Sequence, residues 1–243
     1  MIGDAHAGRP RRPARYAHRM AGELLVCDLG AIEYRACLAL QEDLRDRVAA
    51  GVQTEVLLLL EHPPVYTLGR RSGPEDLPLG EAFYRERGID VVHVNRGGKL
   101  TFHNCGQLVG YPIMRTDDIL GFLRTMESAL IAALTEAGVP AEAGRRPTGV
   151  WVQDRKIASI GVHVTRATTN HGFAVNVDND LDPFSWAVPC GMPGVRMTSV
   201  RAEGGADDLA AFRARAAAAF CAAHGRRAVA VEPEALGATA LPA

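Results

Sequence analysis

Lys156 and Cys190 are the residues whose types and settings best suit covalent chemistry. The chain has 27 basic residues, and only Lys99 and Lys156 among them are lysines. Arginine stays protonated at any accessible pH, whereas a lysine can give up and take back a proton. A lysine retained in so arginine-rich a chain, in a segment flanked by Gly and Ser, is therefore a candidate for proton transfer.

Cys190 differs from the other cysteines because it stands between Pro189 and Gly191 and not on an apolar periodic face. Such a turn exposes a side chain, as a nucleophile requires. An isolated thiol is mostly protonated at pH 7, and a neighbouring ammonium favours the reactive thiolate. Lys156 is a candidate for that ammonium. The alternative is a buried cysteine and a solvated lysine that lie far apart in space.

Length and composition indicate one ordinary globular domain. The 243 residues include 47% hydrophobic residues, enough for a substantial core. A net charge of −1 gives no global attraction to nucleic acid or membrane. No apolar run approaches the roughly 20 residues of a transmembrane helix. We expect a disordered Arg-rich extension at 1–21, which lacks the apolar core of a secretory signal, a single domain at 22–230 and a flexible tail at 231–243.

The cysteines favour a reducing, cytoplasmic setting. Five cysteines are present, with no Cys-x-x-Cys pair and no Cys/His cluster of zinc-binding spacing. We therefore expect no metal and no cofactor, and we expect the four cysteines other than Cys190 to be small buried apolar residues.

Hydrophobic periodicity predicts an α+β fold with a mixed central β-sheet flanked by helices, since strands and helices mix without regular alternation. Aliphatic or alternating runs predict strands, including a hairpin turning at 154–155. Residues at helical spacing predict three long helices, with Thr116 as the cap of the second. The predicted strands are 23–29, 56–60, 90–94, 107–114, 150–164 and 173–177, and the predicted helices are 34–48, 117–137 and 207–223.

Three Gly-rich segments follow predicted strands and are interpreted as turns that converge on a cleft: 96–98, 159–161 and 171–173. Glycine lets a backbone approach a ligand closely. None of them matches a P-loop, a dinucleotide fingerprint or a serine-hydrolase elbow. His103 and His171 are the polar residues attached to two of these turns.

The ordered motifs resemble the lipoyl(octanoyl) transferase family from about residue 24 to residue 200. Each motif is weak alone, whereas their order and spacing together are specific. The matching runs are 62–70 (HPPVYTLGR), 96–103 (RGGKLTFH), 106–113 (GQLVGYPI), 156–161 (KIASIG), 171–177 (HGFAVNV) and 189–191 (PCG).

The resemblance implies a fold shared with lipoate- and biotin-protein ligases, and transfer of octanoyl from acyl carrier protein to a lysine of a lipoyl domain. The acceptors would be the lipoyl domains of 2-oxoacid dehydrogenases and the glycine cleavage H protein. Cys190 would carry the octanoyl thioester and Lys156 would be paired with it. The implied acyl pocket comprises Arg96, Gly97, Gly98, Lys99, Leu100, Thr101, Phe102, His103, Ser159, Ile160, Gly161, Gly172, Phe173 and Ala174.

One departure from the family pattern lies beside the implied pocket. The family usually has His-Gly-Pro-Gly-Gln where this chain has His103-Asn104-Cys105-Gly106-Gln107. Proline fixes φ and glycine permits unusual φ, so the loop must be held differently, and asparagine tolerates positive φ better than most residues. We expect Cys105 to be a spectator; the alternative is a redox-sensitive pair with Cys190.

Two other functions compete with octanoyl transfer. An ATP-dependent lipoate- or biotin-protein ligase would need no cysteine, and the chain lacks the Gly-Arg-Gly-Arg stretch of biotin ligases. A non-catalytic acyl- or lipoyl-domain-binding protein would need neither Cys190 nor Lys156. For an acidic carrier, the candidate docking residues are the pairs Arg70, Arg71 and Arg145, Arg146. We expect a monomer.

Overall fold

The computed structural model describes residues 22–143 and 148–238, with the side chain of Cys190 excepted. The predicted extension at 1–21 and the Arg145–Arg146 pair lie outside the described residues. The strands are β1 (Glu23–Ala31), β2 (Val56–Glu61), β3 (Val65–Leu68), β4 (Asp90–His93), β5 (Thr101–His103), β6 (Gln107–Ile113), β7 (Glu142–Ala143), β8 (Gly149–Val152), β9 (Arg155–Thr165), β10 (Thr168–Asn176), β11 (Arg196–Met197) and β12 (Arg227–Ala230). The helices are α1 (Tyr34–Ala49), α2 (Gly80–Arg85), α3 (Ile119–Glu136) and α4 (Leu209–Ala223), with short 3₁₀ turns η1 (Pro74–Asp76), η2 (Asp182–Trp186), η3 (Pro189–Gly191) and η4 (Pro233–Leu236).

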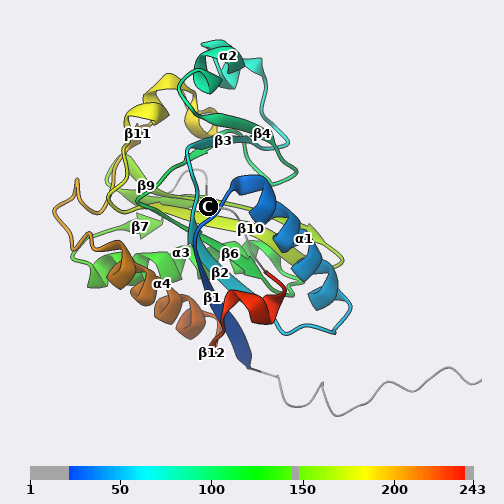
Figure 1. Cartoon of the computed structure of the whole chain (residues 1–243). Helices are drawn as coiled ribbons and strands as arrows, with labels where there is room; N and C mark the ends of the chain where they lie inside the picture. Colours follow the sequence, from blue (N-terminus) through cyan, green and yellow to red (C-terminus); the bar gives the residue numbers. More distant parts are fainter. Residues whose placement is uncertain (1–21, 144–147, 239–243) are drawn as a thin grey trace, which may run out of the picture.

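A mixed sheet forms the centre of the molecule, in the order β12-β1-β2-β6-β10-β9-β8-β7, with β11 added beside β9. The β12–β1–β2 pairs are parallel, and the pairs from β2 to β7 are antiparallel. Helix α1 covers one face of the sheet, whereas α3 and α4 lie together on the other (Figure 1). The predicted α+β class with a mixed, helix-flanked sheet is confirmed.

The aliphatic side chains of β2 are buried on both faces of the sheet. Leu57 and Leu59 pack into the core under α3 and α4, whereas Leu58 and Leu60 pack into the core under α1. Successive side chains of a strand point to opposite faces, so a central strand between two helical layers must be apolar throughout.

A second, three-stranded sheet, ordered β4-β3-β5, lies beside the main sheet together with α2 (Figure 1). Its core is aromatic: the ring of Tyr66 lies 5.0 Å from that of Tyr84 and 4.9 Å from that of Phe102. This small sheet carries β5 and the loop before it, which supply several residues of the predicted pocket.

Three details of the predicted elements differ from the structure. Helix α3 is capped by Asp118, whose carboxylate accepts the amide hydrogen of Gly121, and not by Thr116. The hairpin turns at Gln153–Asp154, one residue earlier than predicted, with Gln153 at φ 57°. The segments 159–161 and 171–173 are paired strands of the sheet and not turns.

The chain after α4 is more ordered than its composition indicated. Strand β12 pairs with β1, and η4 brings Leu236 into the core under α1, where it is fully buried. These residues overlap the segment that we expected to be a flexible tail. Short alanine-rich stretches carry little periodic signal, so β12 was not predicted. No helix in the described part of the chain is long and apolar enough to cross a membrane.

We expect Leu236→Ala to lower the free energy of unfolding by about 2–5 kcal/mol, the usual effect of truncating a fully buried leucine. The matched control is Leu120→Ala, at a leucine that is 74% exposed on α3. Urea denaturation of both variants checks this. Equal, small effects would mean that the segment after β12 is not docked on the core in solution.

Candidate functional site

A cavity of about 530 Å³ lies where β9 and β10 meet the loop between β4 and β5. Residues from α1, α3 and β6 complete its wall. The lining comprises Tyr34, Arg71, Arg96, Gly97, Gly98, Lys99, Leu100, Thr101, His103, Tyr111, Ile119, Leu123, Thr148, Lys156, Ser159, Ile160, Gly161, Val162, His171, Gly172, Phe173 and Ala174. The structure therefore brings together at one cavity segments that are far apart in the sequence.

Lys156 lines this cavity from the second position of β9 and is only 2% exposed. Its ammonium lies 5.5 Å from the ring centroid of Trp151. Gly149, at φ 148°, leaves room for it, since a Cβ at that position would lie 2.7 Å from Cε of Lys156. The amide of Gly149 donates to the buried carboxylate of Glu127 on α3, which fixes this backbone beside the lysine.

The backbone of Cys190 lies in η3, and its side chain lies outside the described atoms. Two contacts hold this turn. The amide of Val188 donates to the carbonyl of Asp76, and Gly191, at φ 64°, lies against the stem of Lys99. The positive φ favours glycine here, and a Cβ would lie 2.1 Å from Cδ of Lys99, so a larger residue would also displace the lysine side chain.

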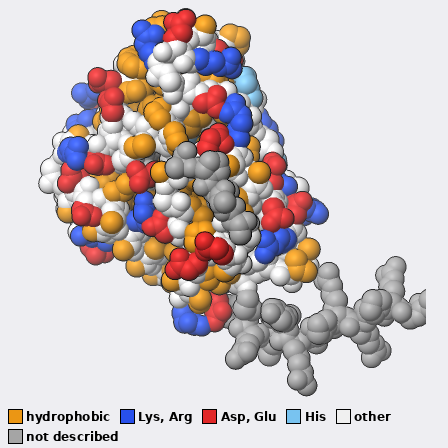
Figure 2. Space-filling view, viewed as in Figure 1, with side chains coloured by type: hydrophobic (Ala, Val, Ile, Leu, Met, Phe, Trp, Pro, Cys, Tyr) orange, Lys and Arg blue, Asp and Glu red, His pale blue; other side chains and the backbone are white. Residues whose placement is uncertain are grey.

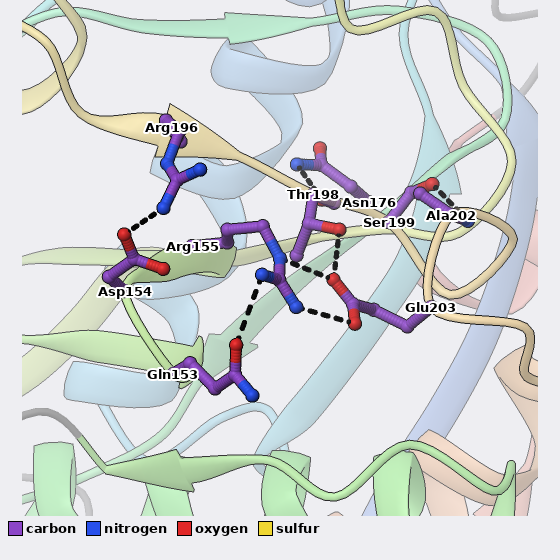
Figure 3. A network of polar contacts seen from close by, with 9 residues as sticks. All are labelled: Gln153, Asp154, Arg155, Asn176, Arg196, Thr198, Ser199, Ala202 and Glu203. Carbon is purple, nitrogen blue, oxygen red and sulfur yellow. Dashed lines mark hydrogen bonds and ion pairs between the residues drawn. The ribbon is translucent and has the colours of Figure 1, made fainter.

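Strand β11 joins the chain that follows Cys190 to the strand that carries Lys156. Met197 is in register with Lys156, and the amide of Thr198 donates to the Lys156 carbonyl at 3.0 Å. Neighbouring Arg155 forms a bidentate pair with Glu203, which also accepts a hydrogen bond from Thr198 (Figure 3). The lysine strand and the cysteine segment are thus held together by backbone pairing and by a side-chain network.

Arg96 braces the glycine-rich loop from beneath. Its buried guanidinium donates to the carbonyls of Gly97 and Lys99 and to both oxygens of Thr67. The amide of Gly97 donates in turn to the carbonyl of Val162 on β9. The loop is therefore tied to both sheets, and its backbone forms one wall of the cavity.

The other two glycine-rich segments lie side by side on neighbouring strands. Ser159 is in register with Ala174, and Gly161 with Gly172. A Cβ at Gly161 would lie 3.0 Å from the carbonyl oxygen of Gly97, so the glycine permits the close approach of the loop. The two segments belong to one cavity wall because they pair across the sheet, and not because turns converge.

Phe102 is the member of the predicted acyl pocket that the cavity does not include. In β5, Thr101 and His103 line the cavity, whereas Phe102 packs into the small aromatic core with its ring 5.5 Å from that of Phe184. The alternation of side chains along a strand requires this division. The acyl-binding role of the remaining residues stays a prediction.

A chain of uncharged aromatic groups closes the cavity beneath α1. His62 donates from Nδ1 to the carbonyl of Ile32, so its Nε2 accepts from the hydroxyl of Tyr111, which is also hydrogen-bonded to Tyr34. Burial lowers the pKa of His62 to about 4 and raises the pKa of both tyrosines. All three groups are therefore neutral at pH 7.

Two neutral histidines, His103 and His171, line the cavity itself. His103 donates from Nδ1 to Gln107, because the amide nitrogen of Gln107 is already a donor to Phe102 and Asn176. Burial lowers the pKa of His103 well below its usual value and that of His171 to about 3. His171 has φ 57°, and its amide donates to Gln41.

The Asn104–Cys105 departure is accommodated by side-chain hydrogen bonds and not by positive φ. Asn104 is buried, donates to the carbonyl of Asp180 and accepts from the side chain of Asn179. Cys105 is exposed, so the expectation that it is buried is wrong, whereas Cys27, Cys37 and Cys221 are buried as expected.

Several cavity residues were not identified from the sequence. Tyr34 belongs to a helix whose periodic pattern explains it as core, and Tyr111 belongs to a buried strand. The one available signal for Tyr111 was its place in the run 106–113, next to a glycine at position 110. Thr148, Ile119 and Leu123 reach the cavity only through tertiary packing.

Comparison with known proteins identifies the family. The model of the lipoyl protein ligase A/B catalytic domain matches residues 33–221. Curated octanoyltransferases are similar along most of the chain: that of Geobacter metallireducens is 47% identical over 74% of this chain and 83% of its own length. The octanoyltransferase of Mycobacterium leprae is 46% identical over 73% of this chain and 77% of its own length.

The chain belongs to the octanoyltransferase family. It is therefore an acyltransferase, as the motifs predicted, and the predicted family is confirmed. Solved structures agree on the fold: a lipoate-protein ligase A bound with ATP is 21% identical, with a TM-score of 0.73 over 88% of this chain and 92% of that chain. A bi-partite lipoate protein ligase from Thermoplasma acidophilum gives a TM-score of 0.68 at 20% identity, over 88% and 89%.

The neutral histidines predict a loss of stability in acid. The folded-state pKa of His62, about 4, lies below the ordinary 6.5, so only the unfolded chain takes up the proton between these values. The contribution of His62 is thus fully present above pH 6.5 and falls by about 3 kcal/mol as pH drops to about 4. We expect His62→Gln to flatten the fall of unfolding free energy between pH 6.5 and 4, measured by urea denaturation. An unchanged slope would mean that His62 is already charged in the folded protein.

Proposed function

We propose that this octanoyltransferase passes an octanoyl group from acyl carrier protein to a lysine of a lipoyl domain through a thioester on Cys190. The observation that supports this best is the pairing of β11, six residues beyond Cys190, with the strand that holds buried Lys156 at the cavity. A nucleophile and a proton acceptor are needed at the same end of an acyl-sized cavity, and the backbone connects their segments there.

The first step forms one thioester and breaks another. The Cys190 thiolate attacks the carbonyl carbon of the octanoyl-carrier thioester, and the carrier sulfur leaves as a thiol after taking up a proton. The ammonium of Lys156 stabilises the thiolate beforehand and supplies that proton. Backbone amides near Cys190 or the loop 96–98 are the candidate donors to the oxyanion of the tetrahedral intermediate.

The second step moves the octanoyl group to nitrogen. The acceptor lysine attacks the Cys190 thioester as a free amine, the new amide bond forms, and the cysteine sulfur leaves as a thiolate. Neutral Lys156 accepts the proton that the attacking nitrogen loses. Because a thioester is already activated and an amide is more stable, the sequence of steps runs without ATP.

The cavity suits a medium acyl chain. Its volume of about 530 Å³ lies within the range of small-molecule sites, and Gly161 lets the loop at Gly97 approach β9 closely and form one wall of the cavity. In its lining, the Tyr111 hydroxyl is bound to the neutral imidazole of His62, and the Arg96 guanidinium is bound to the carbonyls of its own loop, so neither group requires a polar ligand.

The proposed acceptors are the lipoyl domains of 2-oxoacid dehydrogenases and the glycine cleavage H protein. We propose that the enzyme works as a monomer in the cytoplasm, where its cysteines stay reduced and both carrier and acceptors are present.

The decisive experiment is the intact mass of the protein after brief incubation with octanoyl-acyl carrier protein, without ATP. We expect one octanoyl adduct on the wild type, labile to hydroxylamine and absent from Cys190→Ala. Cys105→Ser is the matched control, and we expect it to keep the adduct. No adduct on the wild type from an intact carrier, combined with activity that requires ATP, would support the ligase chemistry instead.

Lys156→Arg separates the two roles of the lysine. The guanidinium keeps a positive charge near the thiol but does not accept a proton at accessible pH. The retained charge still stabilises the Cys190 thiolate, but the guanidinium also supplies no proton to the leaving carrier sulfur. We therefore expect the Cys190 adduct to form more slowly and its transfer to a lipoyl domain to fall at least about 100-fold, within the range of general base catalysis. Normal transfer by this variant would remove Lys156 from the proposed mechanism.

We expect Glu203→Gln to slow turnover about threefold to tenfold without loss of the fold, because the charge pair that holds Arg155 and Thr198 beside β9 is lost. The alkylation rate of Cys190 by iodoacetamide is the second readout and should fall in parallel. Asp207→Asn breaks a comparable ion pair with Arg201 in the same loop and serves as the control. Equal effects of both variants would show that the network has no special connection to Cys190.

A further inference from the structure

Two neighbouring arginines stand apart from the others in how they are paired. Within residues 22–143 and 148–238, every other arginine contacts a carboxylate, a backbone carbonyl or an aromatic ring. The side chains of Arg70 and Arg71 make no such contact with any described residue, and both are exposed. Basic and acidic groups are interspersed over the visible face of the molecule (Figure 2), so unpaired neighbours are unusual here.

Backbone hydrogen bonds place this pair at the cavity. The amide of Arg70 donates to the carbonyl of Arg96, and the amide of Arg71 donates to that of Gly98. Arg71 lines the cavity itself. Gly69 permits this contact, because a Cβ there would lie 2.6 Å from the carbonyl oxygen of Gly98. The two side chains are therefore presented by the same loop that walls the acyl site.

Nearby acids do not neutralise the pair. Glu75 and the buried Asp76 are the acids closest along the chain, and both bind the ammonium of Lys99. On the other side, Arg70 lies close enough to His163 to lower the pKa of that histidine, after the larger effect of burial. The two guanidinium groups thus have no carboxylate partner among residues 22–143 and 148–238, which favours an anion from outside.

We propose that Arg70 and Arg71 bind the phosphodiester of the pantetheine arm that carries the octanoyl group. This assignment rests on the proposed function. A guanidinium binds phosphate oxygens through two parallel hydrogen bonds, and the charges strengthen both bonds. The arm is the one part of the donor that must run from the reacting sulfur to the protein surface, and it carries its phosphate at the far end.

The dimensions of β9 agree with this assignment. Lys156 and His163 lie seven residues apart on the strand, a separation of about 23 Å at roughly 3.3 Å per residue. An extended pantetheine arm and a long arginine side chain together span such a distance. A thioester held beside Lys156 therefore has its phosphate within reach of Arg70, the member of the pair that lies near His163.

A pair of donors that differ only in the phosphate tests the proposal: octanoyl-4′-phosphopantetheine and octanoyl-pantetheine. We measure kcat/KM for octanoyl transfer to a lipoyl domain by the wild type, Arg70→Ala, Arg71→Ala and the double variant. We expect the wild type to prefer the phosphorylated donor about tenfold or more, and the double variant to lose this preference. The control is Arg227→Ala, an exposed arginine at the β12 edge, which should keep the preference.

The remaining outcomes overturn the assignment in different ways. A wild type that does not distinguish the two donors, or variants that keep its preference, would show that the phosphate is not bound by this pair. If the variants lose activity only with octanoyl-acyl carrier protein, the arginines bind the protein surface of the carrier. If the wild type transfers octanoyl from neither of the two pantetheine donors and also not from octanoyl-acyl carrier protein, the proposed function itself fails.

Discussion

The pairing of β9 with its neighbours is the constraint on which the site depends. Along its length β9 contacts β8, β10 and β11 and accepts a hydrogen bond from the loop at Gly97. A shift of one residue would turn Lys156 away from the cavity and bring the opposite face of the strand to it. Register is therefore secured at both ends, by the Arg155–Glu203 pair and by the bond between Gly97 and Val162.

The charged groups at the cavity are compensated to different degrees. Burial keeps His62, His103 and His171 neutral, and each imidazole is hydrogen-bonded to a neutral side chain, of Tyr111, Gln107 and Asn95 respectively. The cations in the lining are Arg96, which donates to carbonyls of its own loop, Lys99, which binds Glu75 and Asp76, Lys156, and the exposed Arg71. The buried cation Arg96 is thus fixed by hydrogen bonds within the protein, as burial of a charge requires.

Long periodic elements were predictable from the sequence, and the pairing of short ones was not. Helices α1, α3 and α4 and strand β2 follow from hydrophobic spacing within a single segment. Strand β11 has only two residues, and Arg196 and Met197 are a strand only because they pair with β9. In the same way, the glycine-rich motifs marked the cavity correctly, but only the antiparallel register of β9 and β10 shows that two of them form one wall.

Composition alone does not distinguish the two lysines of this arginine-rich chain. Their surroundings in the structure differ. Lys99 binds Glu75 and Asp76, and its stem fills the space that Gly191 leaves beside the cysteine turn. Lys156 is buried against the cavity beside Trp151. The small number of lysines therefore marked both residues, and only the structure separates the lysine beside the cysteine turn from the lysine buried at the cavity.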